Sequence, residues 1–412
     1  MVELAKTLEF NVDAIRKDFP ALHQNINGSP LVYLDNGAST QKPQAVIDAI
    51  TKFYSQDYAN VHRGIHSLSQ RATDQFEAAR ESVRAFINAK AIEEVVFTSG
   101  TTDSINLIAT SFGSKFITSG DRILVSEMEH HSNIVPWQIL AERQGAELLV
   151  IPVLKNGELD IASLPDLLND KTKIVAITQV SNALGTINPI KEITAAAHKV
   201  GAKVVLDGAQ SIAHMPVDIQ ALDCDFFVFS GHKIFAPTGI GVLYGKQEIL
   251  EAMPPYRSGG DMIKTVSFSG TEYNTLPYKF EAGTPHISGA IGLAAALDYL
   301  SQIGMENIEA YENQLLAYGT EQMQTIDGLE LVGTAINKAG ILSFYIEGAH
   351  ASDLGTLLDH QGIAIRVGHH CAMPVMEKFG LAATSRASLA MYNNFEDIDR
   401  FVTSLKRSIS ML

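Results

Sequence analysis

The stretch RVGHHC, residues 366–371, places a cysteine directly after two histidines, and all three side chains can bind a metal or take part in catalysis. Cys371 can be a metal ligand, a nucleophile or a buried apolar residue. A metal site requires several ligands that converge on one point, whereas neighbouring side chains of a strand point to opposite faces. The chain also contains no CxxC or HExxH motif. We therefore expect no metal, and the stretch alone leaves the nucleophile and the buried residue open.

Polar side chains also follow four apolar runs that have the composition of strands. In an open α/β sheet, ligands bind at the carboxyl ends of the strands. At the end of VVFTSG, Thr101 and Thr102 begin a helical pattern, and a helix start suits a phosphate. The other three ends carry His130, Asp207 with Gln210, and Ser230 with His232 and Lys233. Taken one at a time, these residues are explained as well by a helix cap, a turn, a polar loop or a solvated lysine.

Together, the four strand ends match the needs of one cofactor, pyridoxal 5′-phosphate. It requires a helix start for its phosphate, a lysine that forms an imine with its aldehyde, and a carboxylate beside its pyridinium nitrogen. Lys233 lies 233 − 207 = 26 residues after Asp207, which fits an aspartate at the end of one strand and a lysine just after the next. We therefore expect Asp207 to keep the ring an electron sink, and Lys233 to hold the aldehyde and move protons.

The elements that must carry these residues alternate between short β-rich runs and helical patterns. Seven strand candidates occupy residues 94–99, 122–127, 147–153, 173–180, 203–208, 225–230 and 241–245. Helical patterns such as residues 135–145 and 190–201 separate several of them. This alternation predicts an α/β fold with a mostly parallel sheet covered by helices on both faces. Beyond about residue 286–310 the rhythm changes and predicts a smaller α+β domain.

Composition narrows the function classes. The chain has 412 residues, 46% of them hydrophobic, which can bury a large core and predict about two domains. Its 31 basic and 46 acidic residues give a net charge of −15, which repels nucleic acid and anionic membranes. The N-terminus lacks the apolar stretch of a signal peptide, no apolar run is long enough to span a bilayer, and two cysteines are too few for a disulfide framework. We expect a cytoplasmic protein in which Cys224 is a buried thiol.

Nine segments of the chain, in this order, resemble the cysteine desulfurases of the SufS type, within the class V aminotransferase family. They are YLDNGAST, NVHRGIH, MEHHSNIVPW, VSNALGTINP, DGAQS, FSGHKIFAPTGIGVLYG, FEAGTP, RVGHHCAMP and RASLAMYN. The resemblance runs from about residue 30 to the C-terminus. It implies a homodimeric transferase of pyridoxal-phosphate fold type I, which converts L-cysteine to L-alanine and an enzyme-bound persulfide. It also implies a segment 1–30 that packs with the small domain, a large cofactor-binding domain 31–290 and a small domain 291–412.

The resemblance implies a role for each candidate residue by position. Lys233 is the imine-forming lysine, Asp207 the partner of the pyridinium nitrogen, and Cys371 the nucleophile that takes the sulfur, with His370 or Arg366 promoting its thiolate. The residues expected around the ring are Gln210 on its hydroxyl, His130 stacked on it as a catalytic residue, and Asn182. Those expected at the phosphate are Thr101, Thr102, Ser230, His232 and, from the other subunit, Thr284. Those expected at the substrate are Asn182 and Arg386 on its carboxylate, with Arg366, His62 and Arg63 as further candidates.

The implied partners are a SufE-type sulfur acceptor and the scaffold machinery of iron–sulfur cluster assembly. Three alternatives stay open. A selenocysteine lyase or an aminotransferase would keep Lys233 and Asp207 without needing Cys371, a thiol hydrolase would not depend on Lys233, and a binding scaffold would tolerate the loss of all three. The chain departs from the expected glycine-rich loop at Arg257 and Ser258 in PPYRSGGDM, which leaves the details of that loop open.

Overall fold

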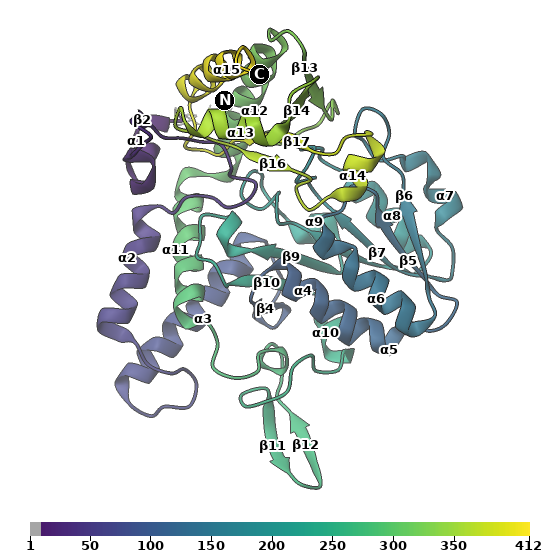
Figure 1. Ribbon diagram of the computed structural model, residues 1–412. Coiled ribbons are helices and arrows are strands. Elements are labelled where there is room, and N and C mark those ends of the chain that lie inside the picture. Colours follow the sequence, from purple (N-terminus) through teal and green to yellow (C-terminus); the bar gives the residue numbers. More distant parts are fainter. Residues whose placement is uncertain (1–9) are drawn as a thin grey trace, which may run out of the picture.

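The computed structural model describes residues 10–412, so residues 1–9 of the predicted N-terminal segment lie outside the described chain (Figure 1). The largest sheet has seven strands in the order β4-β10-β9-β8-β7-β5-β6; β10 runs antiparallel to both neighbours and the other pairs are parallel. The strands are β4 (Val95–Thr98), β5 (Arg122–Ser126), β6 (Glu147–Ile151), β7 (Thr172–Thr178), β8 (Lys203–Asp207), β9 (Phe226–Ser230) and β10 (Gly241–Gly245). Each coincides with one predicted strand, so the expected α/β fold with a mostly parallel sheet is confirmed.

Helices cover both faces of this sheet, which explains why its strands are apolar throughout rather than alternating. In β9, Phe226 and Val228 belong to one core with α4 (Thr101–Ile108) and α6 (Val135–Gln144). Phe227 and Phe229 belong to the opposite core with α3 (Ser67–Phe86), α8 (Ile190–Lys199) and α11 (Ile287–Ile303). The helices of the described chain are α1 (Val12–Lys17), α2 (Gln44–Lys52), α3 (Ser67–Phe86), α4 (Thr101–Ile108), α5 (Ser114–Phe116), α6 (Val135–Gln144), α7 (Leu164–Leu167), α8 (Ile190–Lys199), α9 (Ile219–Leu222), α10 (Gln247–Ala252), α11 (Ile287–Ile303), α12 (Met305–Gln324), α13 (Ala351–Asp359), α14 (Met373–Lys378) and α15 (Phe395–Ile409).

The C-terminal part forms a second, antiparallel sheet in the order β13-β14-β17-β16. Its strands are β13 (Leu329–Val332), β14 (Ile341–Ile346), β16 (Arg366–Gly368) and β17 (Thr384–Ser388). A third core joins it to α12, α13 and α15. The strand β3 (Val32–Tyr33) pairs in parallel with β15 (Ile363–Ala364), so a segment near the N-terminus packs with this part. The domain boundaries at residues 30 and 290 stay predictions, and residue 290 lies within α11, which packs on α2 and α3.

Two short hairpins complete the described chain: β1 (Asn25–Ile26) with β2 (Ser29–Pro30), and β11 (Ile263–Ser267) with β12 (Gly270–Tyr273). The second hairpin extends away from the rest of the chain (Figure 1). Among residues 10–412, no helix combines the length and the apolar sequence that crossing a membrane requires.

Arg80 of α3 is fully buried and fastens the segment before Thr284 to the large sheet. Its guanidinium donates to both carboxylate oxygens of Glu281, at 2.6 and 3.0 Å, and to the carbonyl of Val95 at 2.9 Å. Glu281 in turn accepts a hydrogen bond from the backbone N–H of Phe97 at 2.7 Å. The pair is therefore a satisfied buried ion pair. Arg80 also contacts Glu77 at 3.0 Å, whereas removing Arg80 leaves the Glu281 charge without a cation.

We expect Arg80→Met to lower the free energy of unfolding by about 3–5 kcal/mol, because Glu281 would stay buried without its cation. Urea unfolding followed by circular dichroism measures this loss. Arg84→Met is the matched control on the same helix: it breaks the exposed pair with Glu81, at 2.6 Å, and one hydrogen bond to the Ala89 carbonyl, at 2.9 Å, so it should lower the free energy of unfolding much less. Superimposable curves for Arg80→Met and the wild type would contradict the role given to this pair.

Candidate active site

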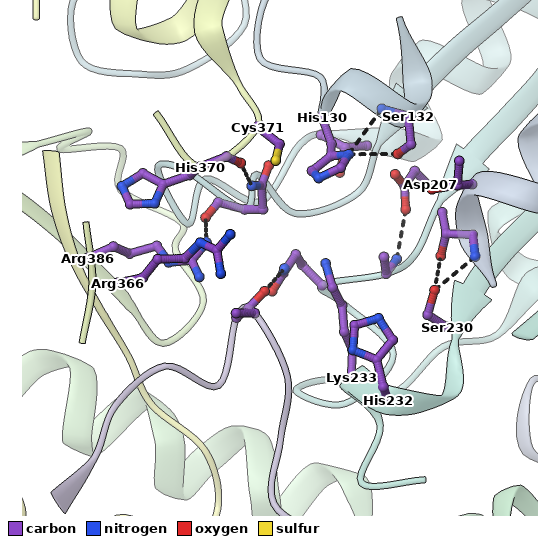
Figure 2. Close-up of a pocket in the computed structure, with 18 residues that line it drawn as sticks. His130, Ser132, Asp207, Ser230, His232, Lys233, Arg366, His370, Cys371 and Arg386 are labelled. Atoms are coloured by element: carbon purple, nitrogen blue, oxygen red, sulfur yellow. Dashed lines mark hydrogen bonds between the residues drawn. The ribbon is translucent and has the colours of Figure 1, made fainter. Parts of the chain in front are cut away.

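A pocket of about 190 Å³ lies at the carboxyl ends of the central strands of the large sheet, where the smaller sheet meets them. Figure 2 shows Asp207, Ser230 and Lys233 entering it from one side, and Cys371, Arg366 and Arg386 from the other. Its lining residues are Gly37, Ala38, Thr101, Thr102, His130, Ser132, Thr178, Asn182, Asp207, Ala209, Gln210, Ser230, His232, Lys233, Arg366, His370, Cys371 and Arg386. Most residues predicted from the sequence are thus brought together in one place.

One end of the pocket is a set of neutral donors, Thr101, Thr102, Ser230 and His232, called the cradle below. The Ser230 hydroxyl lies 2.8 Å from the backbone N–H of Thr101, at the start of α4. This contact requires β10 to pass close to the helix start, since a Cβ at Gly241 would lie 2.4 Å from the Cα of Gly100. Burial lowers the pKa of His232 to about 4, so its ring is neutral at pH 7. Hydroxyls, a helix start and a neutral imidazole suit a phosphate.

The middle of the pocket holds Asp207 and Lys233. Asp207 ends β8, is buried, and accepts a hydrogen bond from the Ala209 N–H at 2.9 Å. Burial raises the pKa of its carboxyl, while the Ala209 N–H and Lys233 oppose that rise. Burial lowers the pKa of Lys233 to about 8, against the opposite effect of Asp207. Lys233 therefore carries a substantial neutral fraction near physiological pH, as a nucleophilic amine requires.

Two arginines lie side by side on adjacent strands of the smaller sheet, because Arg366 of β16 pairs in register with Arg386 of β17. Arg386 is buried, and its Nη1 donates to the carbonyl of Asn182 at 2.7 Å. Its Nη2 lies 3.3 Å from the carboxylate of Asp35, and its Nε has no partner among the described residues. Burial lowers the pKa of Arg386 to about 10. A buried guanidinium with a free nitrogen, beside a second arginine, suits a bidentate carboxylate.

Cys371 lies in a strained turn that precedes α14. His370 and Cys371 both adopt left-handed backbone conformations, with φ of 53° and 55°. The Cys371 carbonyl accepts a hydrogen bond from the His131 N–H at 2.8 Å, and the His370 carbonyl accepts one from the Asn182 side chain at 2.6 Å. Residues far away in the sequence therefore hold the turn in the orientation that brings Cys371 to the pocket.

His370 does not meet the expectation that it promotes the Cys371 thiolate. Its Nε2 is engaged by the Thr384 hydroxyl at 2.8 Å, and burial lowers its pKa to about 3, so the ring is neutral. Figure 2 shows the ring extending to the other side of the turn from Cys371. Arg366, which lines the pocket, is the remaining candidate of the two.

His130 presents a neutral ring to the pocket, since burial lowers its pKa to about 3. Its Nδ1 lies 2.8 Å from the Ser132 hydroxyl, which fixes the ring plane. The preceding residue, Glu129, is buried and accepts hydrogen bonds from the Thr178 N–H at 3.0 Å and the Asn133 side chain at 2.6 Å. A fixed neutral ring is suited to stacking on a flat cofactor.

Three predicted site residues lie elsewhere in the chain. Thr284 lines a separate pocket with Gly239 and His286, and its role in another subunit's site stays a prediction. His62 contacts Glu77 at 2.8 Å, and Arg63 contacts Asp261 at 2.6 Å. Neither His62 nor Arg63 lines the pocket of its own chain. Their predicted role at the substrate therefore stays a prediction.

Sequence reasoning missed several residues of the site. Thr178 and Ser132 line the pocket, Asp35 contacts Arg386, and Glu129 supports the turn of His130. Thr178 ends a predicted strand and Asp35 belongs to the quoted segment YLDNGAST, so position was a signal for both. No group of three or more His, Cys, Asp or Glu side chains among residues 10–412 is arranged to hold a metal.

The donor set fits pyridoxal phosphate: the cradle for the phosphate, His130 for the ring face, Asp207 for the ring nitrogen and Lys233 for the aldehyde. The buried unpartnered Nε of Arg386 fits the carboxylate of an amino acid bound beside it. The arrangement can therefore hold an amino acid on the cofactor with a thiol close to its side chain.

Comparisons with known proteins identify one family. The family model described as aminotransferase class-V matches residues 32–401. A cysteine desulfurase of Synechococcus elongatus is 53% identical over 403 residues, which cover 98% of this chain; the chain spans 64% of that relative's length. A cysteine desulfurase of Pectobacterium carotovorum is 53% identical over 401 residues, covering 97% of this chain and 98% of that protein. The crystal structure of the Escherichia coli cysteine desulfurase CsdA, 40% identical, has a TM-score of 0.92 and covers 98% of this chain and 100% of that chain.

The capture of pyridoxal phosphate by the apoprotein should depend on the neutral amine of Lys233. Because its pKa is lowered to about 8, we expect the capture rate to rise between pH 7 and pH 9 and then level off. Stopped-flow absorbance measures the rate. Asp207→Asn removes the charge that raises the Lys233 pKa, so its midpoint should move to lower pH. A wild-type midpoint at about 10.4, the value of an exposed lysine, would contradict the lowered pKa.

Proposed function

The chain belongs to the class-V aminotransferase family, its cofactor is pyridoxal 5′-phosphate, and we propose that it is a cysteine desulfurase of the SufS type. It converts L-cysteine to L-alanine and leaves the sulfur as a persulfide on Cys371. The observation that carries the proposal is that Cys371 lines the same pocket as Lys233, Asp207 and Arg386. An aminotransferase needs the last three residues but has no use for a thiol held beside them.

When bound, pyridoxal phosphate supplies an electrophilic carbon for the substrate's amine and a ring that withdraws electrons from its α-carbon. Arg386 binds the α-carboxylate of L-cysteine and so sets the direction in which the side chain points. Lys233, with a pKa of about 8, takes up and returns a proton at the α-carbon. His130 would contact the ring face and Asp207 the ring nitrogen, and both side chains are fixed by hydrogen bonds, to Ser132 and to the Ala209 N–H.

Sulfur transfer is the work of Cys371. Its thiolate attacks the sulfur of the substrate, so that an S–S bond forms while the bond between Cβ and sulfur breaks. The electron pair of the broken bond stays with the carbon skeleton, which takes up a proton and leaves as L-alanine. Arg366 lines the same pocket as Cys371.

Cys371→Ser tests this function, because a hydroxyl is hardly ionised at neutral pH while a thiol is partly thiolate. With L-cysteine carrying radiolabelled sulfur, we expect protein-bound label and alanine to fall at least about 100-fold, with cofactor content unchanged. Cys224→Ser is the matched control, a buried cysteine away from the pocket, and should keep both products. Equal label and alanine in Cys371→Ser and the wild type would reduce Cys371 to a packing residue.

Selenocysteine as substrate provides a second arm of that assay. The bond between carbon and selenium is weaker, so selenium can leave without a protein nucleophile. The bonding electron pair then stays on the carbon skeleton, which takes up a proton and becomes alanine, and selenium leaves at the zero oxidation level until a thiol reductant in the assay converts it to selenide. Retained alanine release from selenocysteine by Cys371→Ser would mark selenocysteine lyase as a side activity of the same site. Loss of both activities would make Cys371 necessary for both substrates.

The proposal includes a homodimer, in which Thr284 of one subunit completes the cradle of the other. Thr284 lies outside its own chain's pocket, and the Arg80–Glu281 pair holds the segment that carries it. Large apolar side chains are exposed at Ile65 and at Phe268, the tip of the projecting hairpin. A second subunit that covers such side chains would remove them from water.

Mixing Lys233→Ala with Thr284→Ala tests the dimer. If Thr284 acts across the subunits, each mixed dimer has one intact site, so random reassociation should restore about a quarter of the wild-type sites. Alanine release after reassociation measures the recovery. The pair Lys233→Ala and Asp207→Ala is the control, because both residues belong to one subunit's site and mixing should restore nothing. No recovery in the first mixture, despite mixed dimers, would place Thr284 outside the site.

The proposed partner is a SufE-type acceptor that passes sulfur to iron–sulfur cluster assembly in the cytoplasm. Cys371 is partly exposed in a short turn tied to the large sheet by two hydrogen bonds, so an acceptor has to reach the turn. Exposed His369 and Met373 flank it and offer a contact surface. In the assay with radiolabelled sulfur, the label that has moved to the acceptor is counted separately from the label that stays on the enzyme.

A further inference from the structure

Residues 39–42, between β3 and α2, are hydrogen-bonded to the turn that carries Lys233. Four donors converge on one oxygen, the carbonyl of His232: the Thr40 N–H at 3.1 Å, the Ser39 hydroxyl at 3.1 Å, the Thr40 hydroxyl at 3.2 Å and the Lys42 ammonium at 3.1 Å. The Thr40 hydroxyl also accepts the Phe235 N–H at 2.8 Å, on the other side of the turn. A carbonyl has two lone pairs, so this oxygen has more donors than it can fully use.

Lys42 is the unexpected member of this group. Its ammonium donates only to two backbone carbonyls, those of Thr40 and His232, and no carboxylate of residues 10–412 forms an ion pair with it. Burial lowers its pKa to about 8. A desolvated cation without an anion destabilises a folded protein. The hydrogen-bonding needs of the His232 carbonyl are met by three neutral donors, so what Lys42 adds to the turn is a positive charge.

The cradle lacks such a charge. Thr101, Thr102 and Ser230 are uncharged, and the His232 ring is neutral at pH 7. A phosphate monoester carries about −1.5 to −2 charges at that pH. Lys42 contacts the backbone of His232, whose side chain lines the cradle, and after burial the charges of Lys233 and then of Lys42 lower the pKa of that ring. Lys42, which no carboxylate of residues 10–412 neutralises, thus lies behind a phosphate site whose own donors are all neutral.

We propose that Lys42 is a positioning residue whose charge, held on the carbonyl of His232, stabilises the cofactor's phosphate from behind the cradle. The inference rests on the cradle proposed above but not on the desulfurase reaction. Lys42 does not touch the cofactor: it acts through the His232 peptide and through space. In the apoprotein it is an uncompensated charge, and phosphate binding compensates it.

Titration of apoprotein variants with pyridoxal phosphate and with pyridoxal, which lacks the phosphate, tests the proposal. Lys42→Gln keeps a hydrogen-bond donor and removes the charge. We expect its dissociation constant for pyridoxal phosphate to rise roughly tenfold or more, with that for pyridoxal within about twofold of the wild type. Lys42→Arg keeps the charge and should retain most of the affinity. The melting temperature of the Lys42→Gln apoprotein should be no lower than that of the wild type.

Lys338→Gln is the matched control. Lys338 is another lysine whose pKa burial lowers to about 8 and whose ammonium donates to a carbonyl, that of Gly333, away from the pocket. It should leave both dissociation constants unchanged. Ser230→Ala tests the cradle itself and should weaken pyridoxal phosphate more than pyridoxal.

Each other outcome overturns the inference. Equal losses for both ligands in Lys42→Gln would show that Lys42 only shapes the turn of Lys233. No loss in Lys42→Gln, with a selective loss in Ser230→Ala, would keep the cradle and remove Lys42 from it. No loss in either variant would reject the cradle as well. Failure of Lys42→Gln to fold would contradict the premise that the lysine supplies charge rather than structure.

Discussion

The site depends on burying cationic side chains without pairing all of their hydrogen-bond donors. Lys233 and Arg386 line one pocket, and burial lowers the pKa of Lys233 to about 8 and that of Arg386 to about 10, while Arg366 lines the same pocket from an exposed position. Buried cations of this kind attract an anion that enters the pocket, because the anion replaces the stabilisation that the cations lost when water was excluded. A phosphate and an amino-acid carboxylate are such anions. The buried contact of Arg386 with the Asn182 carbonyl then fixes the direction from which the carboxylate is bound.

The same packing determines the chemistry available to Cys371. Consecutive left-handed residues such as His370 and Cys371 are unfavourable for side chains with a Cβ, so the turn needs external support. The His131 N–H and the Asn182 side chain provide it from the large sheet. A thiol presented to the pocket therefore requires that the two sheets be docked. The dependence of the thiol's position on the docking of the two sheets distinguishes this site from a cofactor site that only has a cysteine nearby.

The segment from Asp35 to Lys42 connects these two requirements. Asp35 contacts Arg386 at the substrate end, while Ser39, Thr40 and Lys42 grip the turn of Lys233 at the cofactor end. One stretch of backbone near the N-terminus thus sets the spacing between the two ends of the pocket. Its small residues allow this close approach, since a Cβ at Gly37 would lie 3.1 Å from the Arg386 guanidinium.

Local composition determined the large sheet and the positions of Asp207 and Lys233. Runs such as FFVF are apolar on both faces because helices cover both, and the carboxyl ends of parallel strands meet at one edge whatever the details of packing. The role of Cys371 came from the resemblance of its flanking residues to the family, and it stays a prediction. A periodic pattern reports burial and direction within an element, so it places residues that belong to regular strands.

Tertiary structure alone decided the contacts that orient these residues. Asp35 meets Arg386 across 351 positions, Thr384 turns His370 away from Cys371, and Lys42 reaches His232 across 190 positions. These side chains lie in turns or at sheet edges, where no period marks which neighbour they will find. Their partners are set by how the two sheets and the N-terminal segment pack, because a hydrogen bond depends on atoms within about 3 Å and not on separation along the chain.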